Sequence, residues 1–178
     1  MGVSLLVAML SGGAAIVLLH SAVWKMAHPR VFRQIIQSHG TLVARLARLL
    51  AIGVPAVEFG IGAGLLASLA VATVHFVAHL ALASAGLAFA AYGVRQLSTG
   101  RAVRCGCMGA DDMFGADTVL RSALLTAIGI AGALDGPLAP PRVDSGQAWI
   151  IVGGGAALVA AVLLVGLKPL ARTPVSAR

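Results

Sequence analysis

The sequence predicts an all-α membrane protein, a polytopic bundle of transmembrane helices. Of the 178 residues, 59% are hydrophobic and 11% are charged, whereas a typical soluble domain has roughly 25% charged residues. So few charged side chains cannot cover the surface of a soluble fold of this size. A helix that crosses the hydrocarbon core needs about 20 mostly apolar residues, and the chain contains several such runs. Lipid is therefore expected to cover much of the surface.

About five apolar runs define the expected helices. The stretch 49–94 has Glu58 as its one charged residue. As a single helix it would be about 69 Å long, over twice the roughly 30 Å hydrocarbon thickness. It must therefore turn back once, near residues 68–70. The expected spans are 3–24, 47–67, 71–94 and 118–138, followed by an additional transmembrane helix at 148–167 and a basic tail at 168–178.

Two local signals refine these spans. Pro140 and Pro141 are expected to end the fourth span, because proline cannot continue a helix. Gly60 and Gly64 form a GxxxG pair, which allows helices to approach closely inside a membrane.

The segment 28–50 is amphipathic. Phe32, Ile35 and Ile36 are apolar at helical spacing, and polar residues separate them. This pattern favours an interfacial helix that lies on the membrane and leads into the next span. A polar loop is the alternative.

The charge distribution predicts an orientation. The formal net charge is +7, and in membrane proteins Lys and Arg accumulate in cytoplasmic loops. With five spans, every Lys and Arg except Arg142 falls on the side of residues 95–117. That side is therefore expected to be cytoplasmic and the N-terminus outside. Nucleic acid is not an expected partner, because the aromatic residues, 4% of the chain, form no basic aromatic patch.

Cys105 and Cys107, the two cysteines of the chain, flank Gly106. A disulfide across one residue should be strained, hence easily reduced and a good oxidant. Glycine tolerates the backbone dihedrals that such a ring needs. The neighbouring Arg101 and Arg104 favour the reactive thiolate. The pattern indicates a redox pair, with two incidental thiols as the alternative.

Other residues are candidates for binding a metal ion or a cofactor. Cys105, Cys107 and Met108 offer soft sulfur ligands that suit Cu(I). His75 and His79 lie at i and i+4 on one face of the third span. Histidines inside a membrane are costly, so both should face the bundle interior. They are candidates for ligands, a proton relay or quinone contacts, or for hydrogen bonds between helices.

Glu58 lies near the middle of the second span, three residues after Pro55. A carboxylate at this depth is costly unless it is paired or protonated, so a functional role is the default interpretation. Lys25, at the end of the first span, is the first candidate partner, and Arg121 is the second. A purely structural polar cluster is the alternative.

Taken in order, these residues resemble a known family. The series comprises Lys25, Phe32, Ile35, Pro55-x-x-Glu58, CGCMG at 105–109 and a basic residue that opens a further span. It resembles the MauE (methylamine utilisation) family, which is grouped with DoxX-like membrane proteins. The resemblance covers roughly residues 1–135, and it implies a MauE/DoxX-like membrane domain over residues 1–138. It departs from the family pattern where Arg121 is followed by serine rather than asparagine.

The resemblance implies a fold and a chemistry. Family members are small multi-pass proteins of the bacterial plasma membrane built on a four-helix bundle, here with one extra C-terminal span. They are associated with thiol–disulfide chemistry, often beside a thioredoxin-like partner. MauE is linked to maturation of the disulfide-rich small subunit of methylamine dehydrogenase. Carried over, Cys105 and Cys107 would be the redox pair, with Glu58 and Lys25 as polar elements of the core.

The expected function is thus an integral membrane thiol–disulfide redox protein that assists maturation of a disulfide-containing partner. Electrons would pass to a membrane carrier such as a quinone, held near Glu58, His75 and His79. A copper-handling membrane protein and a non-catalytic assembly factor are the alternatives. Whether the chain turns over as an enzyme stays open. Maturation of exported proteins would need the cysteines outside, in conflict with the orientation that the charges predict.

Overall fold

The structure is a computed structural model, and it describes residues 2–39, 44–69, 71–100, 104–106, 113–135 and 146–161. Within these ranges the chain forms six helices: α1 (Gly2–Ala27), α2 (Pro29–Ser38), α3 (Ala44–Ser68), α4 (Ala72–Ser98), α5 (Ala116–Leu134) and α6 (Gly146–Ala161). Helices α1, α3, α4 and α5 are long and apolar enough to cross a membrane. The all-α membrane bundle predicted from the composition is confirmed.

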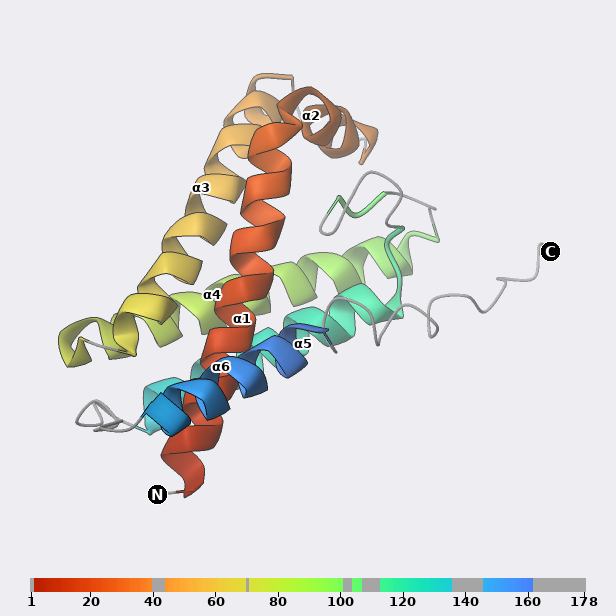
Figure 1. Ribbon diagram of the computed structural model, residues 1–178. Helices are drawn as coiled ribbons and strands as arrows, with labels where there is room; N and C mark the ends of the chain where they lie inside the picture. The colour runs from red at the N-terminus through yellow and green to blue at the C-terminus, as the bar shows by residue number, and fades with distance from the viewer. Residues whose placement is uncertain are drawn as a thin grey trace.

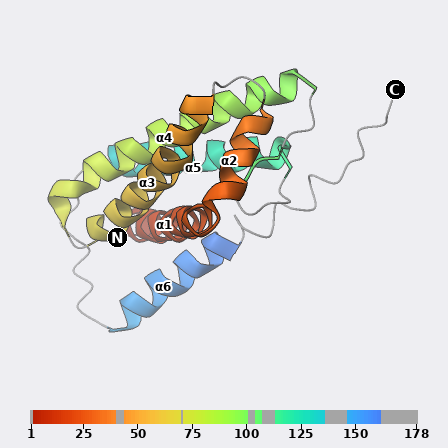
Figure 2. The ribbon, with the colours of Figure 1, turned by 90° about the horizontal axis from the view of Figure 1, so that it is seen from above.

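The four long helices form two pairs that cross each other, α1 with α3 and α4 with α5 (Figure 1). Small and aliphatic side chains from all four helices meet in one core, which includes Ala14, Leu18, Leu65, Leu82 and Ile128. Helix α6 packs against α1, on the side away from α3 and α4 (Figure 2). Helix α1 is therefore the centre of the bundle.

The helix ends differ from the predicted spans by a few residues. Helix α3 ends at Ser68 and α4 begins at Ala72, so the turn lies where the long apolar stretch had to fold back. Helix α5 ends at Leu134 rather than at residue 138. Asp135, Gly136 and Pro137 follow, and both glycine and an approaching proline disfavour helix. The stop signal is thus earlier than Pro140.

Helix α2 buries its apolar stripe against the protein. Phe32 is 5% exposed and Ile35 is 3% exposed. The predicted amphipathic helix is present, but the expectation that its apolar face lies on lipid is wrong for these two residues. They lie under Gly106, where an added Cβ would be 3.1 Å from Ile35 Cδ1 and 3.4 Å from Phe32 Cδ2. Helix α2 therefore joins the segment that holds Cys105 to the bundle.

Glycines bring the helices into close contact, but not the pair expected from the sequence. An added Cβ at Gly60 would meet nothing within 4 Å, and at Gly64 it would make an ordinary 3.5 Å contact with Ala78. At Gly62, by contrast, it would lie 2.8 Å from Leu19 Cγ of α1. The close approach of α3 to α1 depends on Gly62, which the GxxxG spacing does not mark.

The described part of α6 has 16 residues, fewer than the roughly 20 that a span needs. Residues 162–167 of the predicted fifth span and the tail 168–178 lie outside the described residues. Membrane crossing by this helix therefore stays a prediction.

Candidate functional site

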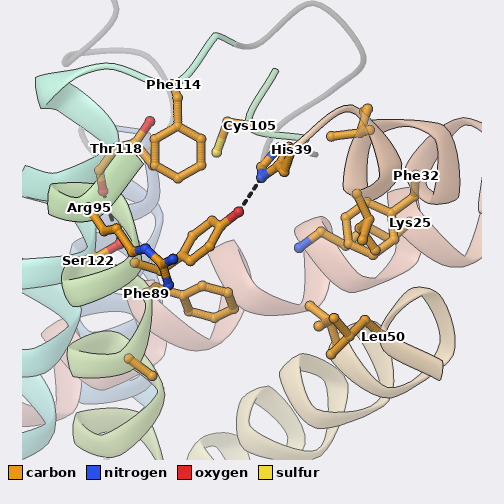
Figure 3. Close-up of a pocket in the computed structure, with 15 residues that line it drawn as sticks. Lys25, Phe32, His39, Leu50, Phe89, Arg95, Cys105, Phe114, Thr118 and Ser122 are labelled. Atoms are coloured by element: carbon orange, nitrogen blue, oxygen red, sulfur yellow. Dashed lines mark hydrogen bonds between the residues drawn. The ribbon is translucent and has the colours of Figure 1, made fainter. Parts of the chain in front are cut away.

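A cavity of about 470 Å³ lies between the two helix pairs, at the end of the bundle where α1 finishes and α5 begins. Its walls are mostly aliphatic and aromatic, and Phe89, Tyr92 and Phe114 supply rings on the side of α4 and α5. Figure 3 shows Lys25 extending toward its centre from α1, opposite the labelled Phe89 and Arg95. An apolar chamber with a few polar groups is typical of a small-molecule site.

Lys25 and Glu58 form a buried ion pair that joins α1 to α3. The exposed fractions of their side chains are 2% and 7%. The Lys25 ammonium also donates a hydrogen bond of 2.9 Å to Ser21 Oγ, and it lies 5.2 Å from the centre of the Phe32 ring. Glu58 Oε1 accepts from Lys25, whereas Oε2 is buried without a hydrogen-bond partner among the described residues. Lys25, the first candidate partner of Glu58, is therefore the residue that pairs with it.

The second candidate partner, Arg121, pairs within its own helix. Its guanidinium lies 3.2 Å from the Asp117 carboxylate, one turn earlier on α5. Both residues are buried, at 6% and 3% exposed. Among the described residues, Arg121 is thus paired with Asp117 and not with Glu58.

Cys105 lines the cavity and is 7% exposed. Its side chain points between the rings of Phe114 and His39 (Figure 3). Gly106 has φ +65°, a left-handed conformation that glycine adopts without strain. Next to Cys105, an isolated antiparallel bridge pairs Arg104 with Met113. Cys107 and Met108 lie outside the described residues, so the predicted pair and the alternative copper site are placed only through Cys105.

A chain of hydrogen bonds holds the backbone beside Cys105. Nε2–H of His39 donates to the Arg104 carbonyl at 2.8 Å. This leaves Nδ1 as the acceptor for the Tyr92 hydroxyl. The Gln96 amide in turn donates to Tyr92 Oη at 2.6 Å. His39 and Gln96 are buried, at 8% and 6% exposed, so α4 and the end of α2 together fix the position of the Cys105 loop.

This arrangement makes a prediction for Tyr92→Phe. The variant keeps the ring in the cavity wall but leaves His39 Nδ1 without its donor, at a cost of about 1–3 kcal/mol for the unsatisfied buried acceptor. The Cys105 loop should loosen, and Cys105 should react several-fold faster with a small maleimide, measured by mass spectrometry in a Cys107→Ser background. Ser98→Ala is the control, because that exposed hydroxyl donates to the Arg95 carbonyl of its own helix and has no other hydrogen bond among the described residues. Equal rates of Cys105 labelling in the two variants would show that the hydrogen bond between Tyr92 and His39 does not hold the loop.

His75 and His79 lie away from the cavity, and three of their four ring nitrogens form hydrogen bonds. Nδ1–H of His79 donates to the His75 carbonyl at 2.8 Å, and its Nε2 accepts from the Ser11 hydroxyl of α1 at 2.8 Å. Nε2–H of His75 donates to the Gly132 carbonyl of α5 at 3.0 Å. The centroids of the two imidazole rings are 4.1 Å apart. These contacts match the alternative of hydrogen bonds between helices, and neither residue lines the cavity.

The structure therefore divides the predicted site residues. Lys25 and Cys105 line one cavity, with Glu58 directly behind Lys25. His75 and His79 are elsewhere. Sequence reasoning missed His39 and Tyr92, because no motif or spacing connects residues that are 53 positions apart. One signal in the sequence could have pointed to His39. It follows an amphipathic segment whose apolar side chains can be buried against the rest of the protein, and this would bring His39 to the bundle as well.

Comparison with known proteins agrees with the order of these residues. The family model described as "Methylamine utilisation protein MauE" matches residues 3–135, which include α1 to α5 and every residue of the cavity wall. No curated protein and no solved structure matches the chain. Because the matched region is well over half of the sequence, the chain belongs to the MauE family of methylamine utilisation proteins.

Proposed function

We propose that this chain is an integral membrane thiol–disulfide redox protein whose reactive pair is Cys105 and Cys107. The observation that carries the proposal is the position of Cys105, buried at the wall of a cavity that also receives the Lys25 ammonium. A positive charge near a cysteine favours the reactive thiolate. Hydrogen bonds through His39 hold the backbone next to the sulfur, as a repeated reaction requires.

The proposed step is exchange through a mixed disulfide. A thiolate of a partner attacks one sulfur of the Cys105–Cys107 disulfide, so that bond breaks and a partner–cysteine bond forms. The second partner thiolate then attacks the mixed disulfide. The partner leaves with a new disulfide, and the pair remains as two thiols. A protein that matures with several disulfides, such as the small subunit of methylamine dehydrogenase, is the proposed client, either directly or through a thioredoxin-like protein.

Single substitutions of the two cysteines test this proposal. Cys105→Ser and Cys107→Ser should each lower oxidation of a soluble dithiol by the purified protein to the background rate, because one thiol cannot form the pair. The thermal unfolding of both variants should stay close to that of the parent. Met113→Leu in the same loop is the control and should keep full activity, since Met113 is exposed.

Two other results would each contradict the proposal. Full activity of both single variants would leave the assembly-factor alternative. A stoichiometric copper ion that the double variant lacks, together with no dithiol oxidation by the parent, would favour the metal-handling alternative, in which Met108 joins the two cysteines.

We also propose an orientation in the bacterial plasma membrane, with the Cys105 loop in the cytoplasm and the N-terminus outside. The described Lys and Arg residues lie at or near the end of the bundle that holds the cavity: Lys25, Arg30, Arg33, Arg45, Arg48, Arg95, Arg104 and Arg121. This clustering supports the orientation through the preference of Lys and Arg for the cytoplasm.

Cysteine labelling in intact cells tests the orientation. A membrane-impermeant maleimide should leave Cys105 and Cys107 unlabelled until the cells are opened. Labelling of intact cells after mild reduction would instead place an oxidised pair outside. That outcome would reverse the orientation and would fit oxidative maturation of an exported client.

A further inference from the structure

We infer that the cavity beside Cys105 binds the ring of a membrane quinone, which accepts the electrons of the reduced cysteine pair. The inference rests on the proposed redox function and names its electron acceptor. Its basis is the combination of a mostly apolar cavity, a thiol in its wall and buried polar atoms that have no hydrogen-bond partner among the described residues.

The shape and lining of the cavity fit a planar apolar ring. Its volume of about 470 Å³ lies within the roughly 300–1,000 Å³ of small-molecule sites. The rings of Phe89 and Phe114 lie on one side of it, with Leu50 of α3 opposite (Figure 3). Tyr92 adds a third ring to the cavity wall. Ala88 lines the cavity and is also exposed on α4. The cavity therefore reaches the helix surface, where a lipid-soluble ligand can enter.

Two polar groups are available for the ring oxygens. Lys25 carries three N–H donors and uses two of them, on Ser21 and Glu58. The third is available to a carbonyl oxygen in the cavity. Thr118, from α5, lines the cavity and is 5% exposed, yet its hydroxyl has no partner among the described residues. A buried hydroxyl without a partner is costly, and a ligand oxygen would satisfy it. A plain acyl chain offers no such oxygen.

The electron balance is complete with these groups. The two thiols lose two electrons and two protons as the sulfur–sulfur bond forms, and the quinone takes up both electrons and two protons to become the quinol. Glu58 Oε2 is buried directly behind Lys25 and has no hydrogen-bond partner in the described part of the chain. A carboxylate in that position can take a proton while the Lys25 ammonium donates one toward the ring, so the pair can pass protons without a net change of charge.

The location differs from the one expected from the sequence. His75 and His79 were candidate quinone contacts, but neither lines the cavity, and three of their four ring nitrogens bond to Ser11 or to backbone carbonyls. The Cys105 thiol and the Lys25 ammonium both line the cavity instead. We therefore assign the quinone to the Cys105 cavity.

A matched pair of alanine substitutions tests the site. Ala88 and Ala91 are both exposed on α4, three residues apart, and only Ala88 lines the cavity. The experiment uses the full chain in nanodiscs, in a Cys105→Ser/Cys107→Ser background that cannot turn over. The probe is a ubiquinone with a single isoprenoid unit, and its affinity is measured by titration calorimetry. Ala88→Trp should weaken binding at least tenfold, whereas Ala91→Trp should leave it unchanged. Thr118→Val, which keeps the shape of the side chain, should weaken binding several-fold.

The possible results are distinct. Equal affinities for the two Trp variants, or no binding at all, would overturn the quinone site and leave the thiol–disulfide proposal untouched. A purified protein that carries phospholipid and no quinone, and loses that lipid in Ala88→Trp, would make the cavity a lipid site and also overturn the inference. The proposed function fails separately, when cysteine variants in the parent background keep dithiol oxidation.

Discussion

Replacing Lys25 by methionine is expected to destabilise the bundle by about 3–5 kcal/mol, the cost of leaving one partner of a buried ion pair without the other. Methionine fills similar volume but offers no charge to Glu58, which is 5% exposed. Helices α1 and α3 would then enclose an unpaired carboxylate. Thermal unfolding of the purified protein, followed by fluorescence-detected size exclusion, measures the loss.

Two comparisons separate the ion pair from a general effect of losing a charge. Lys25→Met combined with Glu58→Gln should recover most of the stability, because no unpaired charge then remains between α1 and α3. Arg48→Met, at an exposed position near the start of α3, should change stability little. If the double variant were as unstable as Lys25→Met alone, the cost would come from packing around Lys25 and not from the stranded carboxylate.

Gly129→Ala is the second substitution with a large expected effect. The added Cβ would lie 2.4 Å from the Ala83 backbone nitrogen and 2.8 Å from the His79 carbonyl oxygen, both on α4. Backbone atoms cannot rotate away, so α4 and α5 must separate along their contact. Overpacking of this kind costs about 1–3 kcal/mol, and the midpoint of thermal unfolding should fall accordingly.

Gly60→Ala is the matched control for that variant. It makes the same chemical change in a helix interior, but nothing lies within 4 Å of the added Cβ. Alanine favours helix over glycine by roughly 1 kcal/mol in water, so this variant should be as stable as the parent or more so. Equal destabilisation by both substitutions would show that the α4–α5 contact at Gly129 is looser than the structure places it.

The sequence was sufficient for the features that depend on composition and length. Long, mostly apolar runs set the four long helices, and the excess length of the stretch around Glu58 required the turn after Ser68. The cost of a charge inside a membrane also made Lys25 the first candidate partner of Glu58, and the structure joins them. These are local or energetic constraints that any fold of the chain must satisfy.

The missed features depend on how the helices face each other. The GxxxG spacing marks Gly60 and Gly64, but the rotation of α3 about its axis puts Gly62 against α1 instead. The contact between His39 and Tyr92 likewise joins the end of α2 to α4 across 53 positions. Hydrophobicity fixes which segments are helices, but it does not fix their rotation, and the cavity exists because of that rotation.

The Lys25–Glu58 pair also has a consequence for how the chain enters the membrane. Lys25 lies near the end of α1, so before α3 is made its long side chain can reach the polar interface. Glu58 lies deep in α3 and has no such route. Insertion of α3 should therefore depend on α1 already being in place, which makes the first helix an intramolecular chaperone for the second span. Glycosylation mapping of a chain that lacks α1 would show this as loss of α3 insertion, which Glu58→Leu should restore.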